Sequence, residues 1–347
     1  MKNTKIVKIK DIEIGGGGNI AIQSMLNVPT ADTGLALEQI NRLFDAGCEI
    51  VRLAVPDMAA ADAMHEIVSK SPLPVVADIH FDYRLALKCI ESGVHKIRIN
   101  PGNLGGEEKA AAVAKAALEA KVPIRIGVNG GSLEKGLLEK CGGDLPRAMV
   151  ESARGHVEIL NRYGFDDIVL SMKSSDVKST IAAYRLASSE FDYPLHLGVT
   201  EAGTTREGIV KSAIGIGSLL ADGIGDTIRV SLTDDPVEEI KAAKLILKSL
   251  GLGGDSITIV SCPTCGRTKI DLIPIANAIS DATANINKKL KVAVMGCVVN
   301  GPGEASDADI GIAGGDGCAV LFKKGEICGK IAENEIVEVL LREIEKM

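Results

Sequence analysis

Hydrophobic and polar positions follow one repeated pattern along the chain up to Gly251. A stretch with helical periodicity ends at a glycine, one or two polar residues follow, and a short run rich in Val and Ile comes next, as at residues 47–52, 93–98, 164–169 and 225–229. Glycine allows a helix to end in the left-handed region of backbone conformation. Each repeat therefore predicts the end of a helix followed by a β-strand.

Further apolar runs complete a predicted set of eight strands, at residues 20–24, 74–78, 124–128 and 194–198. Amphipathic stretches lie between the strands, for example at residues 35–46, 107–120 and 237–250. Eight alternating strands and helices favour a (β/α)8 TIM barrel. A doubly wound open sheet is the alternative, but it usually carries a phosphate fingerprint after its first strand, and this sequence has none there.

Short segments outside this pattern predict hairpins and turns. Residues 6–10 and 12–14 predict a small hairpin that plugs the bottom of the barrel. The glycine run at 15–18 is interpreted as a turn, because neither a Lys-Ser/Thr pair nor a helix follows it. Residues 311–317 are interpreted in the same way, because a second hairpin is predicted at residues 322–327.

The strand–helix rhythm changes beyond Gly251, and this change predicts a domain boundary. We expect a TIM barrel of residues 1–254 and a smaller α/β domain of residues 255–347, with the linker near residues 251–255.

Strand alternation separates the side chains that face the barrel axis from those that face the helices. In the run from Ile97 to Asn100 the isoleucines face the helices, so Arg98 and Asn100 face the axis. The same rule places five cations at the mouth of the barrel: Arg52, Arg98, Arg125, Lys173 and Arg229. Guanidinium groups suit phosphate oxygens, so these cations predict an anionic ligand.

Acidic and neutral polar groups share the same strand ends. Asp78, His80, Thr200 and Glu201 are candidates for orienting hydroxyl groups and moving protons. An alternative is that some of the arginines only pair with Asp78 or Glu201 and stabilise the barrel. The other histidines and the barrel cysteines are interpreted as structural: His65, His95, His156, Cys48, Cys89 and Cys141.

The predicted second domain contains the motif Cys262-Pro-Thr-Cys265, followed much later by Cys297 in a glycine-rich loop. No second C-x-x-C pair is present, and three thiolates leave a tetrahedral iron–sulfur cluster one protein ligand short. The iron without a thiolate is then free to bind a substrate. A structural zinc ribbon or a redox-active cysteine pair are the alternatives.

Composition narrows the classes of function. Hydrophobic residues make up 46% of the 347 residues, aromatic residues only 3%, and Trp is absent, as is usual for parallel α/β proteins. The net charge of −7 argues against nucleic acid as the main partner. We expect no signal peptide and no membrane span, and eight cysteines without secretory features indicate a reducing, cytoplasmic location.

The ordered motifs resemble those of the 4-hydroxy-3-methylbut-2-enyl diphosphate synthases, in their bacterial two-domain form. The resemblance covers essentially the whole chain. Its motifs begin at Gln23, Val51, Asp78, Arg98, Arg125, Ser171, His196 and Arg229, and continue with Cys262-Pro-Thr-Cys265-Gly-Arg267 and Gly296-Cys297-Val-Val-Asn300-Gly-Pro-Gly-Glu304. These enzymes belong to the non-mevalonate pathway of isoprenoid biosynthesis.

The resemblance implies a reductive enzyme that acts on 2-C-methyl-D-erythritol 2,4-cyclodiphosphate. The ring is opened and a hydroxyl is removed, which consumes two electrons and releases water. A 4Fe–4S cluster held by Cys262, Cys265, Cys297 and Glu304 would pass the electrons singly from ferredoxin or flavodoxin. The resemblance also implies a homodimer in which the cluster domain of one chain covers the barrel of the other.

The resemblance assigns roles to matching residues. Those that would hold the diphosphate are Arg52, Arg98, Arg125, Lys173, Arg229 and Ser231. Those that would line the carbon skeleton are Asp78, His80, Asn100, Asn129 and Thr200. Glu201 would donate a proton to the departing oxygen, and Asn300 would lie beside the cluster.

Two other functions use the same features. A redox-inert TIM-barrel lyase or transferase with a structural zinc appendage would explain the cations, but a structural zinc site should have four protein ligands. An iron or redox sensor with a labile cluster would leave the polar barrel mouth without a role.

Overall fold

The computed structural model describes residues 1–284, 286–298, 305 and 307–347. The chain forms two compact units, Met1–Leu252 and Gly253–Met347. Each unit has its own hydrophobic core.

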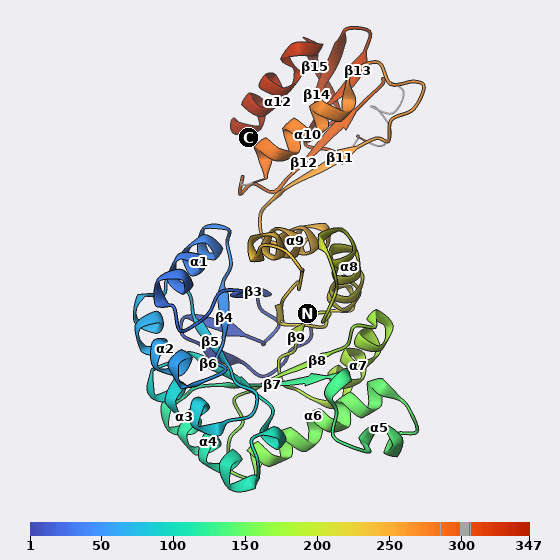
Figure 1. Cartoon of the computed structure of the whole chain (residues 1–347). Coiled ribbons are helices and arrows are strands. Elements are labelled where there is room, and N and C mark those ends of the chain that lie inside the picture. The colour runs from blue at the N-terminus through green and yellow to red at the C-terminus, as the bar shows by residue number, and fades with distance from the viewer. Residues whose placement is uncertain (285, 299–304, 306) are drawn as a thin grey trace. The chain divides into compact units, whose positions relative to one another are not determined.

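The first unit is a parallel β-barrel surrounded by helices (Figure 1). Its strands are hydrogen-bonded in the order β8-β7-β6-β5-β4-β3-β10-β9, and a parallel bridge between Leu170 and Leu195 joins the two ends of this sheet. The strands are β3 (Ala21–Met25), β4 (Ile50–Ala54), β5 (Val75–Asp78), β6 (Lys96–Ile99), β7 (Ile124–Asn129), β8 (Ile168–Lys173), β9 (His196–Leu197) and β10 (Thr227–Ile228). The fold class predicted from the sequence is confirmed.

Helices follow the strands and form the outer layer. They are α1 (Thr33–Asp45), α2 (Met58–Lys70), α3 (Tyr83–Glu91), α4 (Glu107–Ala120), α6 (Leu145–Asn161), α7 (Val177–Glu190), α8 (Thr205–Ala221) and α9 (Pro236–Ser249), with the short α5 (Leu137–Lys140) before α6. Six of them begin behind an aspartate whose carboxylate accepts a backbone N–H of the first turn: Asp32, Asp57, Asp82, Asp144, Asp176 and Asp235. Such caps satisfy N–H groups that have no partner within the helix.

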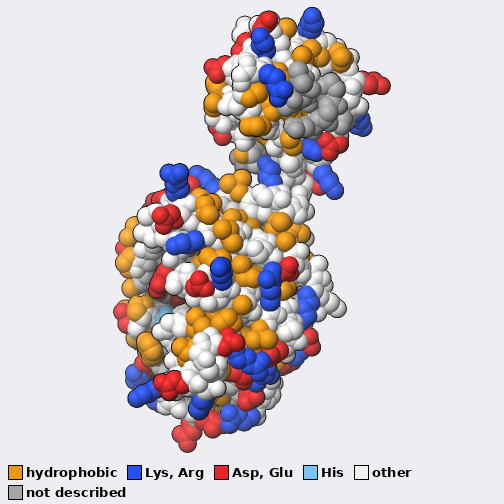
Figure 2. All heavy atoms as spheres, turned by 90° about the vertical axis from the view of Figure 1, so that its right-hand side faces the viewer, with side chains coloured by type: hydrophobic (Ala, Val, Ile, Leu, Met, Phe, Trp, Pro, Cys, Tyr) orange, Lys and Arg blue, Asp and Glu red, His pale blue; other side chains and the backbone are white. Residues whose placement is uncertain are grey.

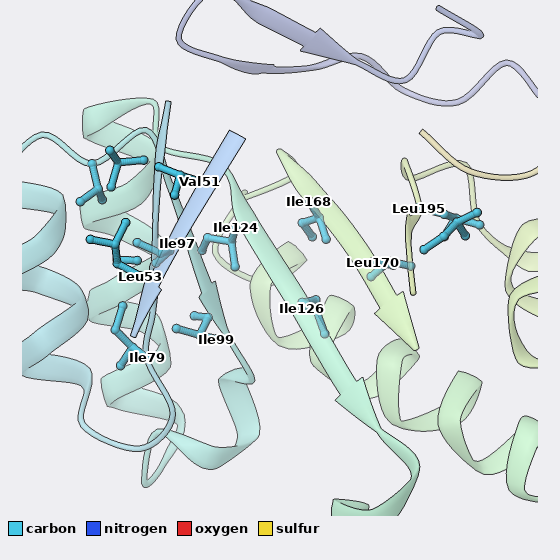
Figure 3. Packing of buried hydrophobic residues seen from close by; sticks show 14 of the residues in the cluster. Val51, Leu53, Ile79, Ile97, Ile99, Ile124, Ile126, Ile168, Leu170 and Leu195 are labelled. Atoms are coloured by element: carbon cyan, nitrogen blue, oxygen red, sulfur yellow. The ribbon is translucent and has the colours of Figure 1, made fainter. Parts of the chain in front are cut away.

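The main core lies between the strands and the helices. Figure 3 shows its strand side chains, including Ile97 and Ile99 of β6 and Ile124 and Ile126 of β7. Since successive strand residues point to opposite faces, the residues between them, such as Arg98 and Arg125, face the barrel interior.

The N-terminal hairpin has the predicted strands, β1 (Val7–Ile9) and β2 (Ile12–Ile14), paired antiparallel. Val7, Ile9 and Ile14 are buried in one cluster with Ala21, Ile50, Val76 and Val169 of the barrel strands. The hairpin therefore covers an apolar layer of the barrel interior.

The second unit is a five-stranded sheet in the order β11-β12-β13-β14-β15. Its strands are β11 (Ile257–Ser261), β12 (Leu290–Met295), β13 (Ile310–Gly315), β14 (Cys318–Lys323) and β15 (Glu326–Ala332). The first three are parallel, and the last two join by antiparallel pairing. Helices α10 (Leu272–Thr283) and α12 (Ile336–Glu345) bury apolar side chains in one cluster with the sheet.

One local prediction in this unit is wrong. Residues 311–315 are not a turn but belong to strand β13, and only the two residues that follow turn into β14. Gly311 and Gly314 pass close to neighbouring backbone, so these glycines permit close strand packing rather than a turn. The hairpin predicted at 322–327 is present, with Lys323 opposite Glu326.

Acidic and basic side chains are interspersed on the face of the molecule shown in Figure 2. Several form exposed ion pairs, such as Arg162 with Glu107 and Arg185 with Asp222, and such pairs contribute little to stability. None of the helices in the described residues combines the length and the apolar character needed to cross a membrane.

Candidate active site

A cavity of about 270 Å³ opens at the carboxyl ends of the barrel strands. This end of a TIM barrel is where the active site of such enzymes lies. The side chains and glycine that line it are Met25, Arg52, Asp78, His80, Arg98, Arg125, Gly127, Asn129, Ser171, Lys173, Thr200, Arg229 and Ser231.

Among the described residues, five cations and a single carboxylate line this cavity. Asp78 of β5 is the carboxylate, and its oxygens lie 3.3 Å from Arg98 and 3.8 Å from Arg52. His80 lies 3.5 Å from the same carboxylate and is half exposed. The excess of positive charge favours binding of a small polyanion, because burial in a cavity strengthens the attraction between charges.

The pKa values of these groups are consistent with the excess of positive charge in the cavity. Burial raises the pKa of Asp78, but the charge of Arg52, a hydrogen bond from His80 and the charge of Arg98 outweigh it, and the net pKa is well below its usual range. Burial lowers the pKa of Arg52 to about 10, and repulsion from Arg229 and Arg98 adds to this. Burial and repulsion likewise lower the pKa of Arg125 and of Lys173 well below their usual ranges.

Arg229 forms an ion pair with a buried carboxylate outside the cavity lining. Its Nη2 and Nε donate to Glu239 of α9 at 3.1 and 3.2 Å. Glu239 also accepts the Ser24 hydroxyl at 2.8 Å and the Leu232 N–H at 3.1 Å. The guanidinium therefore has a fixed position at the edge of the cavity.

Lys173 lies beside a neutral histidine. Its Nζ is 3.4 Å from His196 Nε2, and His196 Nδ1 is 2.8 Å from the Thr227 hydroxyl. Burial and the nearby charges of Arg125 and Lys173 lower the pKa of His196 well below its usual range. An imidazole in this state can accept a hydrogen bond from the amine.

Gly127 joins two site residues of the neighbouring strand. Its N–H donates to Asn100 Oδ1 at 3.0 Å, and its carbonyl accepts from Arg98 Nη2 at 2.8 Å. A Cβ at this position would lie 2.3 Å from Arg98 Nε. Glycine is thus required for Arg98 to lie across β7.

The structure brings most of the sequence-predicted barrel residues together. His80 and all the predicted substrate-binding residues except Asn100 line the cavity. Asn100 is buried beside it and bonds to Gly127 instead. Glu201 follows Thr200 in the loop after β9, is exposed, and has a left-handed backbone with φ of 52°, a conformation that is strained for a side chain of this kind.

Three residues of the site were not predicted. Met25 accepts from Arg52 Nη2 at 2.7 Å, Ser171 lines the cavity, and Glu239 rather than Glu201 binds Arg229. Met25 and Ser171 have the inward strand phase of Gln23 and Lys173, so alternation could have identified them. Glu239 lies on α9, the helix that follows β10 and Arg229, and no local pattern in the sequence shows that the helix turns this carboxylate toward the barrel.

In the second unit, the cysteine loops leave neighbouring parallel strands at the same end. Cys262 follows β11 and Cys297 follows β12, and Ser261 pairs with Val294. Cys262 Sγ accepts the Gly296 N–H at 3.1 Å, and the Lys269 N–H donates to the Gly296 carbonyl at 2.8 Å. The two loops therefore meet at Gly296.

The three thiols differ in exposure. Cys297 is buried, Cys262 is half-buried, and Cys265 is exposed, with a pKa lowered by hydrogen bonds from Arg267. Thiols on two adjoining loops, one of them accepting an N–H bond, suit an iron–sulfur cluster in their chemistry. Within the described residues, no three His, Cys, Asp or Glu side chains are gathered at the spacing of metal ligands. Asn300 and Glu304 lie outside the described residues.

Comparison with known proteins covers both units. Residues 4–244 match the family model described as the GcpE TIM-barrel domain, and residues 258–346 match the GcpE protein C-terminal domain. The chain belongs to the GcpE family. GcpE family enzymes are iron–sulfur proteins.

Two relatives with curated names match the chain over almost its whole length. The 4-hydroxy-3-methylbut-2-en-1-yl diphosphate synthase (flavodoxin) of Clostridium perfringens is 59% identical over 344 residues, covering 99% of each chain. The protein of the same name from Caldanaerobacter subterraneus is 58% identical over 346 residues, covering 100% of this chain and 98% of its own.

Solved structures of other enzymes share the fold of the GcpE barrel. A dihydropteroate synthase from Stenotrophomonas maltophilia matches with a TM-score of 0.52 at 12% identity, over 72% of this chain and 98% of its own. A truncated 3-deoxy-D-arabino-heptulosonate 7-phosphate synthase from Thermotoga maritima matches with a TM-score of 0.51 at 15% identity, over 72% of this chain and 94% of its own. At these identities the likeness concerns the fold alone.

Proposed function

We propose that this chain catalyses the reductive opening of 2-C-methyl-D-erythritol 2,4-cyclodiphosphate to (E)-4-hydroxy-3-methylbut-2-enyl diphosphate. The reaction takes up two electrons and two protons and releases one water. The carrying observation is the cavity with five cations and one carboxylate at the barrel mouth, in a chain 59% identical to a synthase of that product.

The cations bind the diphosphate in this proposal. Arg98 and Arg229 are held by Gly127 and Glu239, so they meet the phosphate oxygens with little loss of conformational freedom. Buried Arg125 and Lys173 gain most from an anion, because burial and nearby cations disfavour their charged forms in the unliganded barrel and an anion would offset both effects. The full diphosphate set is Arg52, Arg98, Arg125, Lys173, Arg229 and Ser231.

The remaining polar groups orient the carbon skeleton. Asn129, Thr200, Asp78 and His80 line the cavity, and Asn100 lies beside it. Glu201 donates a proton to the departing hydroxyl oxygen. Its exposed carboxylate on a strained backbone supports this role, since backbone strain is concentrated at functional sites.

We assign Cys262, Cys265, Cys297 and Glu304 as ligands of a 4Fe–4S cluster, with Asn300 beside it. When bound, this cluster supplies the two electrons one at a time. The N–H bond from Gly296 to Cys262 Sγ supports the assignment, because hydrogen bonds to sulfur tune the reduction potential of such clusters. A carboxylate would be held by iron more weakly than a thiolate, so Glu304 would be the most easily displaced of these four ligands.

We further propose flavodoxin as the electron donor, because the names of the relatives include it, with ferredoxin as the alternative. The family resemblance also supports a homodimer. All eight cysteines are free thiols, which supports a location in the reducing cytoplasm.

The test is anaerobic purification followed by iron and sulfide analysis, a visible spectrum, and turnover of the cyclodiphosphate with dithionite. We expect about four irons per chain and a thiolate-to-iron absorption band at about 400 nm. Cys297→Ser should remove both the iron and the turnover, while Cys318→Ser, in the same unit, should keep both.

A colourless protein with one zinc and no turnover would contradict the proposal and favour the lyase or transferase. A Cys297→Ser protein that keeps its iron would contradict the ligand assignment alone.

A further inference from the structure

His156 of α6 touches the loops that follow two neighbouring strands of the site. Its imidazole is buried, with 4% of the side chain exposed. Nδ1 accepts the backbone N–H of Gly102 at 3.1 Å, in the short helix η1 (Pro101–Asn103) after β6. Nε2 lies 3.0 Å from Glu134 Oε1, beyond η2 (Gly130–Ser132) after β7.

These partners define the state of the ring. Nδ1 carries no hydrogen because it accepts from Gly102, so Nε2 carries the hydrogen and donates it to the carboxylate. The hydrogen bond from His156 lowers the pKa of Glu134 to about 2, so Glu134 is ionised when the ring is neutral. Ser152, one turn earlier on α6, donates to the same Oε1 at 3.0 Å.

The two loops that His156 contacts each begin next to a residue of the site. Asn100 immediately precedes η1, and its amide oxygen accepts the Gly127 N–H. Asn129 immediately precedes η2 and lines the cavity. A Cβ on Gly102 would lie 2.8 Å from the imidazole Cε1, so the first loop is in direct contact with the ring.

We propose that His156 is a positioning residue for the reaction, which holds Asn100 and Asn129 against the carbon skeleton by tying both loops to α6. This inference takes its substrate from the proposed function. The way in which His156 positions the two loops follows from the hydrogen bonds described above. Positioning groups act through orientation, where small displacements reduce the rate strongly. His156 forms its hydrogen bonds with Gly102 and Glu134 and not with the cations of the site. Substitution of His156 should therefore disturb the orientation of the carbon skeleton more than the binding of the phosphate groups.

Three substitutions separate the two hydrogen bonds. His156→Asn keeps an acceptor near the Nδ1 position, His156→Gln keeps a donor near the Nε2 position, and His156→Phe keeps neither. His95→Asn is the control, because His95 Nδ1 also accepts a backbone N–H, that of Val75 at 3.0 Å, but at the opposite end of the strands.

For His156→Phe we expect kcat/KM for the cyclodiphosphate to fall at least tenfold, while the Kd for inorganic pyrophosphate changes less than twofold. His156→Asn and His156→Gln should each recover part of the loss, and His95→Asn should retain wild-type kcat/KM. Hydrogen exchange at Gly102 and Asn103 should accelerate in His156→Phe, measured by mass spectrometry on the full-length protein.

Unchanged kcat/KM in His156→Phe would overturn the inference, as would an equal loss in His95→Asn. A parallel loss of pyrophosphate binding would also overturn it, since that result indicates a general loss of structure. If the wild-type protein does not turn over the cyclodiphosphate, the proposed function fails, whereas the exchange of Gly102 still reports on the loop contact.

Discussion

At the scale of single residues, the cations of the barrel mouth differ in what holds them. Arg98 is fixed by Asp78 and by the Gly127 carbonyl, and Arg229 by Glu239. Arg125 has two buried nitrogens, Nε and Nη1, without a hydrogen-bond partner in the described protein. Buried polar atoms nearly always find partners, so Arg125 is the side chain whose surroundings a bound anion would change most.

Gly127→Ala should weaken the binding of inorganic pyrophosphate about tenfold, which corresponds to about 1.4 kcal/mol. The new methyl group would lie 2.3 Å from Arg98 Nε and displace the guanidinium. Titration calorimetry measures the effect. Gly131→Ala is the control, because apart from its chain neighbours no described residue has an atom within 4 Å of the added Cβ. Equal affinities in the two variants would contradict the role of Gly127.

Glu239→Gln should lower the free energy of unfolding by about 3 kcal/mol, because it leaves Arg229 without its buried countercharge. Pyrophosphate should then raise the unfolding temperature more in the variant than in the wild type, since the anion replaces that charge. Urea unfolding and thermal shifts measure both. Among the described residues the half-buried neighbour Glu238 pairs only with exposed Lys241, so Glu238→Gln should alter stability by less than about 0.5 kcal/mol. A smaller thermal shift in Glu239→Gln would contradict the pairing.

At the scale of elements, the N-terminal hairpin and the barrel strands share one apolar cluster. Ile9 and Ile14 are fully buried and lie with Ile50, Val76 and Val169. The hairpin itself has only three residue pairs in register, so its stability must come from this packing rather than from its own hydrogen bonds.

Ile9→Ala should therefore lower the free energy of unfolding by about 2–5 kcal/mol, through lost apolar burial and the cavity it leaves. Ile6→Ala is the matched control, because Ile6 is 60% exposed just before the same hairpin. Chemical denaturation of both variants gives the comparison. Similar losses at the two positions would mean that the hairpin does not depend on its contact with the barrel interior.

At the scale of the whole molecule, an acidic chain with a net charge of −7 concentrates positive charge inside its barrel. Lys96 comes two residues before Arg98 on β6 and is fully buried. Its Nζ has no hydrogen-bond partner in the described protein. Burial and repulsion from Arg125 and Arg52 lower the pKa of Lys96 well below its usual range. The barrel interior is thus a region where binding of an anion and uptake of protons are linked.

Binding of trimetaphosphate, a cyclic phosphate anion that is itself not protonated near neutral pH, should be accompanied by proton uptake. The anion raises the lowered pKa values of Lys96 and Lys173, so these amines bind protons, and anion affinity falls as the pH rises above the lowered pKa values of the free protein. Calorimetry in two buffers of different ionisation enthalpy measures the protons.

Lys96→Met should reduce the number of protons taken up, whereas Lys70→Met, at an exposed lysine paired with Glu66, should not. Proton release on binding, or no difference between these two variants, would contradict the linkage.

Local patterns in the amino-acid sequence are enough to predict several features of this protein. Helix-ending glycines and apolar runs identified the barrel strands, and their alternation identified which side of β6 and β7 carries Arg98, Arg125 and Asn129. The spacing of Cys262 and Cys265 on a tight turn likewise indicated a site for metal or cluster ligands. These predictions are possible because strand period and turn chemistry act over a few residues.

Which groups meet across the barrel depends on the three-dimensional fold. It gave Arg229 the carboxylate of Glu239 rather than that of Glu201, turned Asn100 toward Gly127, and placed His156 between two loops. It also made residues 311–315 a strand, because Gly311 and Gly314 allow close contact with neighbouring segments. The physical reason is the same in each case: these contacts join different elements of the fold, and their energies depend on burial and distance, which no local pattern specifies.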